Sequence, residues 1–130
     1  MILLNDFFSI VNQKGRVEDG SLAFDVKLNR NHVIYQAHFP GSPITPGVCM
    51  IQLVTECLQI ALEKKLSIKQ IKNIKFLNTL NPDEVSAISI FFTKVDLSCE
   101  GVCSMQSSVR ITAGETVYAK MSVIYNYNTL

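Results

Sequence analysis

The sequence predicts a single α+β domain in which one long helix packs against a curved antiparallel sheet. Residues 48–65 are the helix candidate, and because they are apolar nearly all round, the rest of the domain must cover them. The second half of the chain consists of strand-like runs separated by turn residues. With 130 residues, 48% of them hydrophobic, the chain is long enough for one core. No linker divides it, so we expect residues 1–130 to form one domain.

Two strands are expected ahead of the helix. Residues 7–13 are a candidate first strand, which turns at Lys14-Gly15 or at Asp19-Gly20. Residues 22–28 are the second candidate, because apolar side chains there alternate with polar or small ones. This alternation is typical of a strand with one face on the core.

The helix candidate has start and stop signals. Thr45 is expected to be the N-cap and Pro46 to lie in the first turn. At the other end, Lys64 and Lys65 complement the negative pole of the helix dipole.

A narrow polar stripe interrupts the apolar surface of this helix. Gln52, Glu56, Gln59 and Glu63 are spaced four, three and four residues apart, so they share one face. For the last three residues we expect a solvated or interface-facing edge.

Three or four strands are expected after the helix. The candidate runs cover residues 68–77, 85–95, 102–111 and 116–127. Turn residues separate the later runs, at 81–83, 100–101 and 113–115. The second half should therefore be an antiparallel meander.

Charge and cysteine content narrow the functional classes. A formal net charge of +1 does not point to nucleic acid. The apolar start of the chain reaches neither signal-peptide nor membrane-span length, so a cytoplasmic protein is expected. Cys49, Cys57, Cys99 and Cys103 lack the paired C-x-x-C and histidine spacing of a zinc site. We expect four reduced, mostly buried thiols and no metal.

The most informative segment, HFPGSPITPGV at residues 38–48, lies directly before the helix. It contains one histidine, three prolines and two glycines. Prolines fix φ and glycines allow close approach of the backbone, so the segment predicts a shaped loop that ends on a helix N-terminus. Free N–H groups at a helix start can polarise a carbonyl group, and an imidazole titrates near neutral pH.

This segment, the helix after it, and the later Lys75-Phe76 and Pro82-Asp83-Glu84 resemble the 3-hydroxyacyl-acyl-carrier-protein dehydratases of the hotdog fold, the FabZ and FabA type. The resemblance covers most of the chain, and the signature H-F-P-G-x-P-x-x-P-G-V is matched without a gap. The family's basic residues near the N-terminus are missing, and its P-G-D turn is replaced here. The resemblance implies a sheet wrapped round a central helix, and a dimer with two active sites at its interface.

Elimination of water from a 3-hydroxyacyl thioester needs a base for the α-proton, donors for the enolate oxygen and an acid for the leaving hydroxyl. By the resemblance, His38 is the base, and the N–H groups at Gly47 and Val48 polarise the thioester carbonyl. Gly47 is then expected because a side chain would block that approach. Further substrate-binding residues are expected at Phe39, Pro40, Gly41, Pro46, Val48 and Phe76.

The acid position departs from the family pattern. The family carries Glu or Asp fourteen residues after the histidine, presented across the dimer interface, whereas this chain has Gln52 there. An amide cannot deliver a proton, and a positioned acid contributes about 10²–10⁴-fold to the rate. Glu56 is a possible substitute, although four residues of helix displace a side chain by about 6 Å. A partner subunit that carries the acid is the other possibility.

Three functions remain open. The first, which we favour, is a dehydratase of fatty-acid or polyketide type, alone or as half of a heterodimer. The second is an acyl-thioester hydrolase (thioesterase) in which Gln52 orients a water molecule. The third is a non-catalytic subunit that binds an acyl chain or an acyl carrier protein. No metal or organic cofactor is implied, and the substrate would be carried on the phosphopantetheine of acyl carrier protein.

We expect a homodimer or a larger assembly of dimers, because a single curved sheet leaves its edge strands open. The interface strand should contain or adjoin residues 33–37. A lysine cluster at the helix end and in the following strand is a candidate docking surface for an acidic carrier protein, with a solvated face as the alternative. Its members are Lys64, Lys65, Lys69, Lys72 and Lys75.

Overall fold

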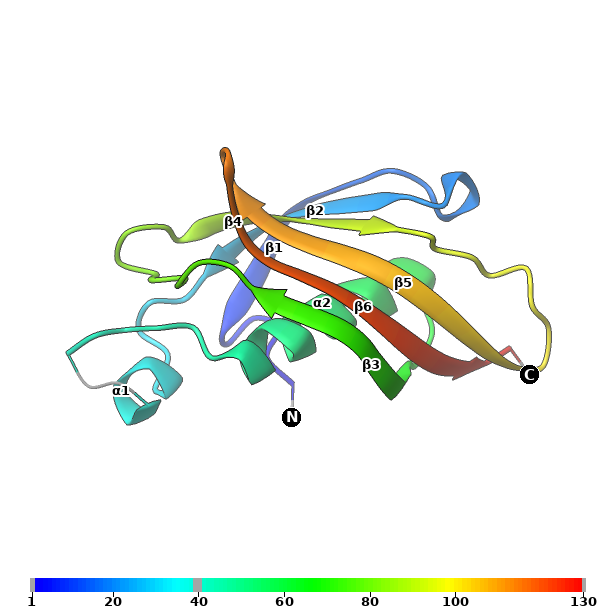
Figure 1. Ribbon diagram of the computed structural model, residues 1–130, viewed down its shortest axis with the longest axis horizontal. Helices are drawn as coiled ribbons and strands as arrows, with labels where there is room; N and C mark the ends of the chain where they lie inside the picture. The colour runs from blue at the N-terminus through cyan, green and yellow to red at the C-terminus, as the bar shows by residue number, and fades with distance from the viewer. Residues whose placement is uncertain (1, 39–40, 130) are drawn as a thin grey trace.

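The computed structural model describes residues 2–38 and 41–129, apart from the side chain of His38. Its elements follow in the order β1 (Phe8–Lys14), a short 3-10 turn η1 (Val17–Asp19), β2 (Leu22–Leu28), α1 (Ile34–His38), α2 (Gly47–Leu62), β3 (Ser67–Phe76), β4 (Ala87–Thr93), β5 (Val102–Ala113) and β6 (Thr116–Asn128). Figure 1 shows α2 lying along one face of a single curved sheet, with α1 beyond the N-terminal end of α2. The predicted α+β class, with one long helix against an antiparallel sheet, is confirmed.

The sheet has six strands in the order β1-β2-β4-β5-β6-β3, and all its neighbouring pairs are antiparallel. After α2 the chain enters β3, which pairs with β6 at the far edge, and it then returns to β4 beside β2. The strand β2 has the predicted bounds, and the three last strands agree with the predicted runs to within a few residues. The edge strand β3 is exposed along nearly its whole length.

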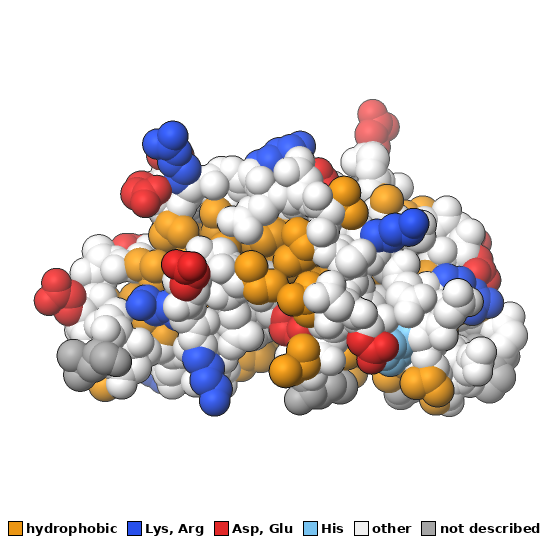
Figure 2. All heavy atoms as spheres, turned by 180° about the vertical axis from the view of Figure 1, so that it is seen from behind, with side chains coloured by type: hydrophobic (Ala, Val, Ile, Leu, Met, Phe, Trp, Pro, Cys, Tyr) orange, Lys and Arg blue, Asp and Glu red, His pale blue; other side chains and the backbone are white. Residues whose placement is uncertain are grey.

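The core lies between α2 and the inner face of the sheet. Along β5 and β6 buried residues alternate with exposed or half-buried ones, as expected for strands that cover a helix on one side only. The helix contributes Cys49, Leu53, Val54, Cys57 and Leu58, each with at most 1% of its surface exposed. Seen from behind, hydrophobic side chains also gather in the middle of the surface (Figure 2).

Three local predictions are wrong. Thr45 is not the N-cap, because its side chain is buried against Tyr35; Pro46 occupies the cap position and makes no side-chain capping bond. The helix ends at Leu62, before the two lysines expected in its last turn, where Glu63 takes a left-handed conformation with φ 53°. Residues 33–37 do not belong to a strand, because most of them form α1.

The cysteines divide into two pairs. Cys49 and Cys57 are buried free thiols, as predicted, and burial raises the pKa of both. Cys99 and Cys103 form a disulfide, which corrects the expectation of four reduced thiols. The segment entering β5 brings their Cα atoms to 6.0 Å, within the range that a disulfide spans. In the described ranges no helix is long and apolar enough to cross a membrane.

Candidate active site

The first half of the candidate site is the start of α2. The carbonyl oxygen of Pro46 accepts the N–H groups of Cys49 and Met50, at 3.0 and 3.2 Å. The N–H groups of Gly47 and Val48 have no acceptor among the described residues. Gly47, but not Val48, lines a cavity of about 340 Å³, together with residues 44–46, Met50 and residues 76–80. Two backbone donors at the positive end of the helix dipole are suited to a carbonyl oxygen that gains negative charge.

Gly47 is constrained by packing as well as by access. A Cβ atom at this position would lie 2.6 Å from Cζ of Phe76 and 2.9 Å from its Cε2, so the ring occupies the space that a side chain would need. The ring itself is 48% exposed. A side chain at position 47 would therefore displace the ring of Phe76, a contact that the sequence alone did not reveal. Gly47, Pro46 and Phe76, all predicted site residues, line the same cavity.

The loop between the two helices is held by buried polar contacts. The hydroxyl groups of Tyr35 and Thr45 lie 3.0 Å apart, and the Thr45 N–H donates to the carbonyl oxygen of Leu80 at 2.9 Å. The ring of Tyr35 stacks on Phe7, with centroids 5.4 Å apart. Burial raises the pKa of Tyr35 to about 12. These contacts fix the end of the signature loop against the core, so the start of α2 has a defined position.

The histidine end of the signature is described in part. His38 is the last residue of α1, and only its backbone is described. Phe39 and Pro40 lie outside the described residues. Gly41 is exposed, has φ 82°, and has open space where a Cβ would project. The roles predicted for these four positions therefore stay predictions.

The second half of the candidate site is the polar stripe of α2. The Nε2 atom of Gln52 donates to Oε2 of Glu56 at 2.8 Å. Because a carboxylate only accepts hydrogen bonds, the amide nitrogen and not its oxygen must face Glu56. The amide oxygen of Gln52 is therefore turned away from Glu56.

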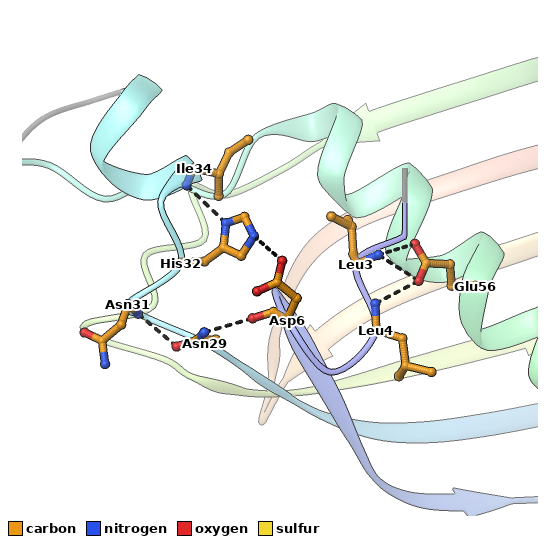
Figure 3. A network of polar contacts seen from close by, with 8 residues as sticks. All are labelled: Leu3, Leu4, Asp6, Asn29, Asn31, His32, Ile34 and Glu56. Carbon is orange, nitrogen blue, oxygen red and sulfur yellow. Dashed lines mark hydrogen bonds and ion pairs between the residues drawn. The ribbon is translucent and has the colours of Figure 1, made fainter.

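Glu56 is buried, with 5% of its surface exposed, and not the solvated edge that its position on the stripe predicted. The Leu3 N–H donates to both of its carboxylate oxygens, at 3.0 and 2.9 Å, and the Leu4 N–H donates to Oε1 at 2.8 Å (Figure 3). Burial raises the pKa of the neighbouring Cys57 thiol, and the charge of Glu56 raises it further. Together with the bond from Gln52, these contacts make Glu56 the anchor of the N-terminal segment.

The other end of this N-terminal segment is anchored near α1. The carboxylate of Asp6 faces Nε2 of His32 at 3.2 Å, and the backbone oxygen of Asp6 accepts from the Asn29 side chain at 2.8 Å. Nδ1 of His32 accepts the Ile34 N–H at 3.1 Å, so in the neutral ring Nε2 carries the proton. Residues 3–6 thus tie α2 to the segment that enters α1 (Figure 3). The sequence pattern around Asp6, Asn29 and His32 gave no indication that these residues hold the N-terminal segment against α1.

Gln52 and Glu56 line a second cavity, of about 510 Å³, whose walls also include Ile2, Leu4 and Ile60. Gln52 does not line the cavity beside Gly47, and Gly47 does not line this one. Within one chain the two halves of the candidate site therefore open into different cavities. The described residues include no cluster of histidine, cysteine and carboxylate side chains that could hold a metal ion.

The sequence is similar to that of known dehydratases. A profile of the ApeI-like family, described as ApeI dehydratase, matches residues 13–113. The 3-hydroxyacyl-[acyl-carrier-protein] dehydratase FabZ of Clostridium acetobutylicum is 32% identical over 94 residues, which cover 66% of this chain and 67% of that protein. The FabZ of Clostridium botulinum strain Loch Maree is 27% identical over 118 residues, covering 85% of this chain and 79% of its own length.

Solved structures share the fold. One is the dehydratase heterocomplex ApeI:P from Xenorhabdus doucetiae, with a TM-score of 0.71, 17% identity, and coverage of 89% of this chain and 95% of that one. A thioesterase from Pseudomonas aeruginosa has a TM-score of 0.58 and 11% identity, with coverage of 95% and 82%. These similarities identify the fold as a hotdog fold. Because the family profile spans well over half of the sequence, the chain belongs to the ApeI-like dehydratase family.

Proposed function

We propose that this protein acts on 3-hydroxyacyl thioesters as a dehydratase-type enzyme of fatty-acid or polyketide-type synthesis, with acyl groups carried on the phosphopantetheine of acyl carrier protein and no resident cofactor. The observation that carries the proposal is the open start of α2. The N–H groups of Gly47 and Val48 have no acceptor among the described residues, these two residues end a complete dehydratase signature, and Gly47 lines a cavity. Membership of the ApeI-like family supports the same reaction class.

In the proposed reaction His38 takes the α-proton of the bound thioester. The electrons of the broken C–H bond move toward the carbonyl, and the N–H groups of Gly47 and Val48 stabilise the negative charge on its oxygen. The C3–O bond then breaks, a double bond forms between C2 and C3, and the hydroxyl leaves as water once it receives a proton. Phe76 beside Gly47 would cover the thioester from solvent.

Gln52 occupies the position at which the family carries its acid, but it cannot supply a proton to the leaving group. Its amide nitrogen donates to Glu56, and an amide has no acidic proton to give to a leaving hydroxyl. Glu56 does not replace the acid in our proposal, because its two oxygens already accept from Leu3, Leu4 and Gln52. The proton must come from elsewhere.

A partner chain is our proposed source of that proton. The two halves of the site open into different cavities of one chain, and a second hotdog chain would bring its own acid position to the His38 side. The edge strand β3 supports pairing, because Ile68 is 42% and Ile71 38% exposed on its helix-facing side. The ApeI:P relative is a dehydratase heterocomplex. We therefore propose a hotdog heterodimer as the active form, and a homodimer as the form of the isolated chain.

Restoring the acid tests the proposal. Gln52→Glu in the purified chain should raise the dehydration rate of a 3-hydroxyacyl thioester by at least about tenfold, the lower range of what a positioned acid contributes. The introduced carboxyl would lie beside Glu56, and two adjacent carboxyl groups retain a proton more readily than one alone. The matched control is Gln59→Glu, the same change two turns further along α2, which should leave the rate unchanged. No gain in Gln52→Glu would contradict the proposed role of the position.

A second candidate function is hydrolysis of the acyl thioester. The helix start would polarise the thioester carbonyl for attack by water as well, and in this reaction Gln52 would be the residue that orients the water. Both reactions can be followed in one mixture, since hydrolysis releases a free thiol, whereas dehydration produces a conjugated 2-enoyl thioester that absorbs in the ultraviolet. Thiol release without enoyl product would favour the hydrolase.

A further inference from the structure

The outer face of the sheet, opposite α2, carries three cations in direct cross-strand register. Arg110 of β5 pairs with Lys120 of β6, and Lys120 pairs with Lys75 of β3. Ala119 and Met121, on either side of Lys120, are buried, so Lys120 points away from the core. We call Arg110, Lys120 and Lys75 the basic row. The predicted lysine cluster is therefore divided, since Lys64 and Lys65 line the cavity beside Gln52 instead.

The basic row is bordered by a second row of neutral donors on the same face. Thr93 pairs with Ser108, Ser108 with Ser122, and Ser122 with Asn73, across the strands β4, β5, β6 and β3. We call these four residues the hydroxyl-amide row. Together the two rows line a hollow of about 400 Å³ on the sheet surface. This volume lies within the range of small-molecule sites.

The charges of the basic row are not compensated within the described part of the chain. Among the described residues, no carboxylate forms an ion pair with Arg110, Lys120 or Lys75. Arg110 instead lies over the ring of Phe91, with its Cζ 5.1 Å from the ring centroid. Like charges directly opposite each other destabilise a sheet. If this face served only solubility, acidic residues could alternate with the basic ones and remove the repulsion. The uncompensated positive charges therefore point to an anionic ligand.

We propose that this hollow binds the phosphate groups of a small molecule, with a diphosphate as the preferred unit. Lysine, arginine and hydroxyl donors together are the chemistry that recognises phosphate oxygens. Neighbouring strands lie about 4.8 Å apart, so the outer members of the basic row are separated by about 10 Å at the backbone. A diphosphate spans this width and can contact all three cations at once, whereas a single phosphate covers only part of the row. Phe91 and Arg110 offer a flat surface for a planar group at one end of the row.

Titration calorimetry with inorganic phosphate, inorganic pyrophosphate and ADP tests this proposal on the whole chain. Pyrophosphate and ADP should bind with a dissociation constant at least about tenfold lower than that of phosphate, since the third cation is then engaged. Lys120→Gln should weaken pyrophosphate binding by at least about tenfold, and Ser122→Ala by a few-fold. The matched control is Lys69→Gln, a lysine of the neighbouring edge strand β3 that does not line the hollow. ADP binding tighter than pyrophosphate would identify a nucleotide as the source of the diphosphate.

A thermal melt of Lys120→Gln without ligand adds an independent readout. The change removes the central one of three like charges, so the melting temperature should rise while pyrophosphate binding is lost. A lysine with only a structural role would not combine higher stability with lost binding. Equal loss of binding in Lys120→Gln and Lys69→Gln would overturn the proposal, because the attraction would then be general surface charge. Absence of pyrophosphate binding at millimolar concentration would overturn it as well.

Discussion

Glu56 provides a quantitative test of how the site is held. Its carboxylate accepts the N–H groups of Leu3 and Leu4 and the side-chain amide of Gln52, at distances between 2.8 and 3.0 Å. Hydrogen bonds to a charged group contribute about 1.5–3 kcal/mol each, and the Leu3 N–H is buried, so it finds no water when the acceptor is lost. Glu56→Ala should therefore lower the free energy of unfolding by about 3–5 kcal/mol.

Glu56→Gln separates this anchoring role from an acid role. The variant keeps the shape of the side chain, but the Leu3 N–H contacts both carboxylate oxygens, so the new amide nitrogen faces this donor in either orientation. We expect a loss of about 2–3 kcal/mol in urea denaturation, and faster hydrogen exchange at the amides of Leu3 and Leu4. Glu63→Gln, the same change at the exposed end of α2, should stay within about 0.5 kcal/mol of the wild type. Unchanged stability together with lost dehydration in Glu56→Gln would refute the anchor and make Glu56 the acid.

Three further predictions concern other parts of the fold. Gly47→Ala should lower the free energy of unfolding by less than about 1 kcal/mol in urea denaturation, because the new Cβ displaces only the half-exposed ring of Phe76; a larger loss that Phe76→Ala does not recover would contradict this contact. The pKa of Tyr35 is raised to about 12, above the ordinary value near 10, so its contribution to stability is complete below pH 10 and is lost as the pH rises toward 12. Tyr35→Phe should therefore flatten the alkaline decline of the urea midpoint, and an unchanged pH profile would contradict the assignment. Cys103→Ser opens a disulfide between residues four apart in sequence, and it should cost about 2 kcal/mol under oxidising conditions and nothing under reducing ones.

The fold was largely predictable because its signals are local. Alternating apolar side chains in residues 22–28 and the apolar helix after the signature loop each determine one element, and β2 matches its predicted bounds. The errors arise where tertiary contacts override a local preference. Thr45 has the side chain of a good N-cap, but its hydroxyl is used by Tyr35, and its backbone N–H by Leu80. Residues 33–37 are β-compatible in sequence, yet most of them form α1.

The candidate site was predictable only as far as its motif extends. The signature indicated a helix start with free N–H groups at Gly47, but not that the ring of Phe76 lies over this position. Glu56 was expected on a solvated edge, because its position on the stripe carries no information about a segment more than fifty residues earlier in the chain. The basic row likewise depends on strand register between Lys75, Lys120 and Arg110, which no spacing in the sequence reveals.

Exchange of the α-proton in deuterated water tests the central claim most directly. If His38 and the start of α2 form a working enolate site that lacks only its proton donor, the isolated chain should exchange the α-proton of an acyl thioester faster than it dehydrates the 3-hydroxyacyl analogue. His38→Ala should abolish both reactions. Rapid dehydration by the isolated chain, or no exchange above that of the His38→Ala variant, would contradict the account.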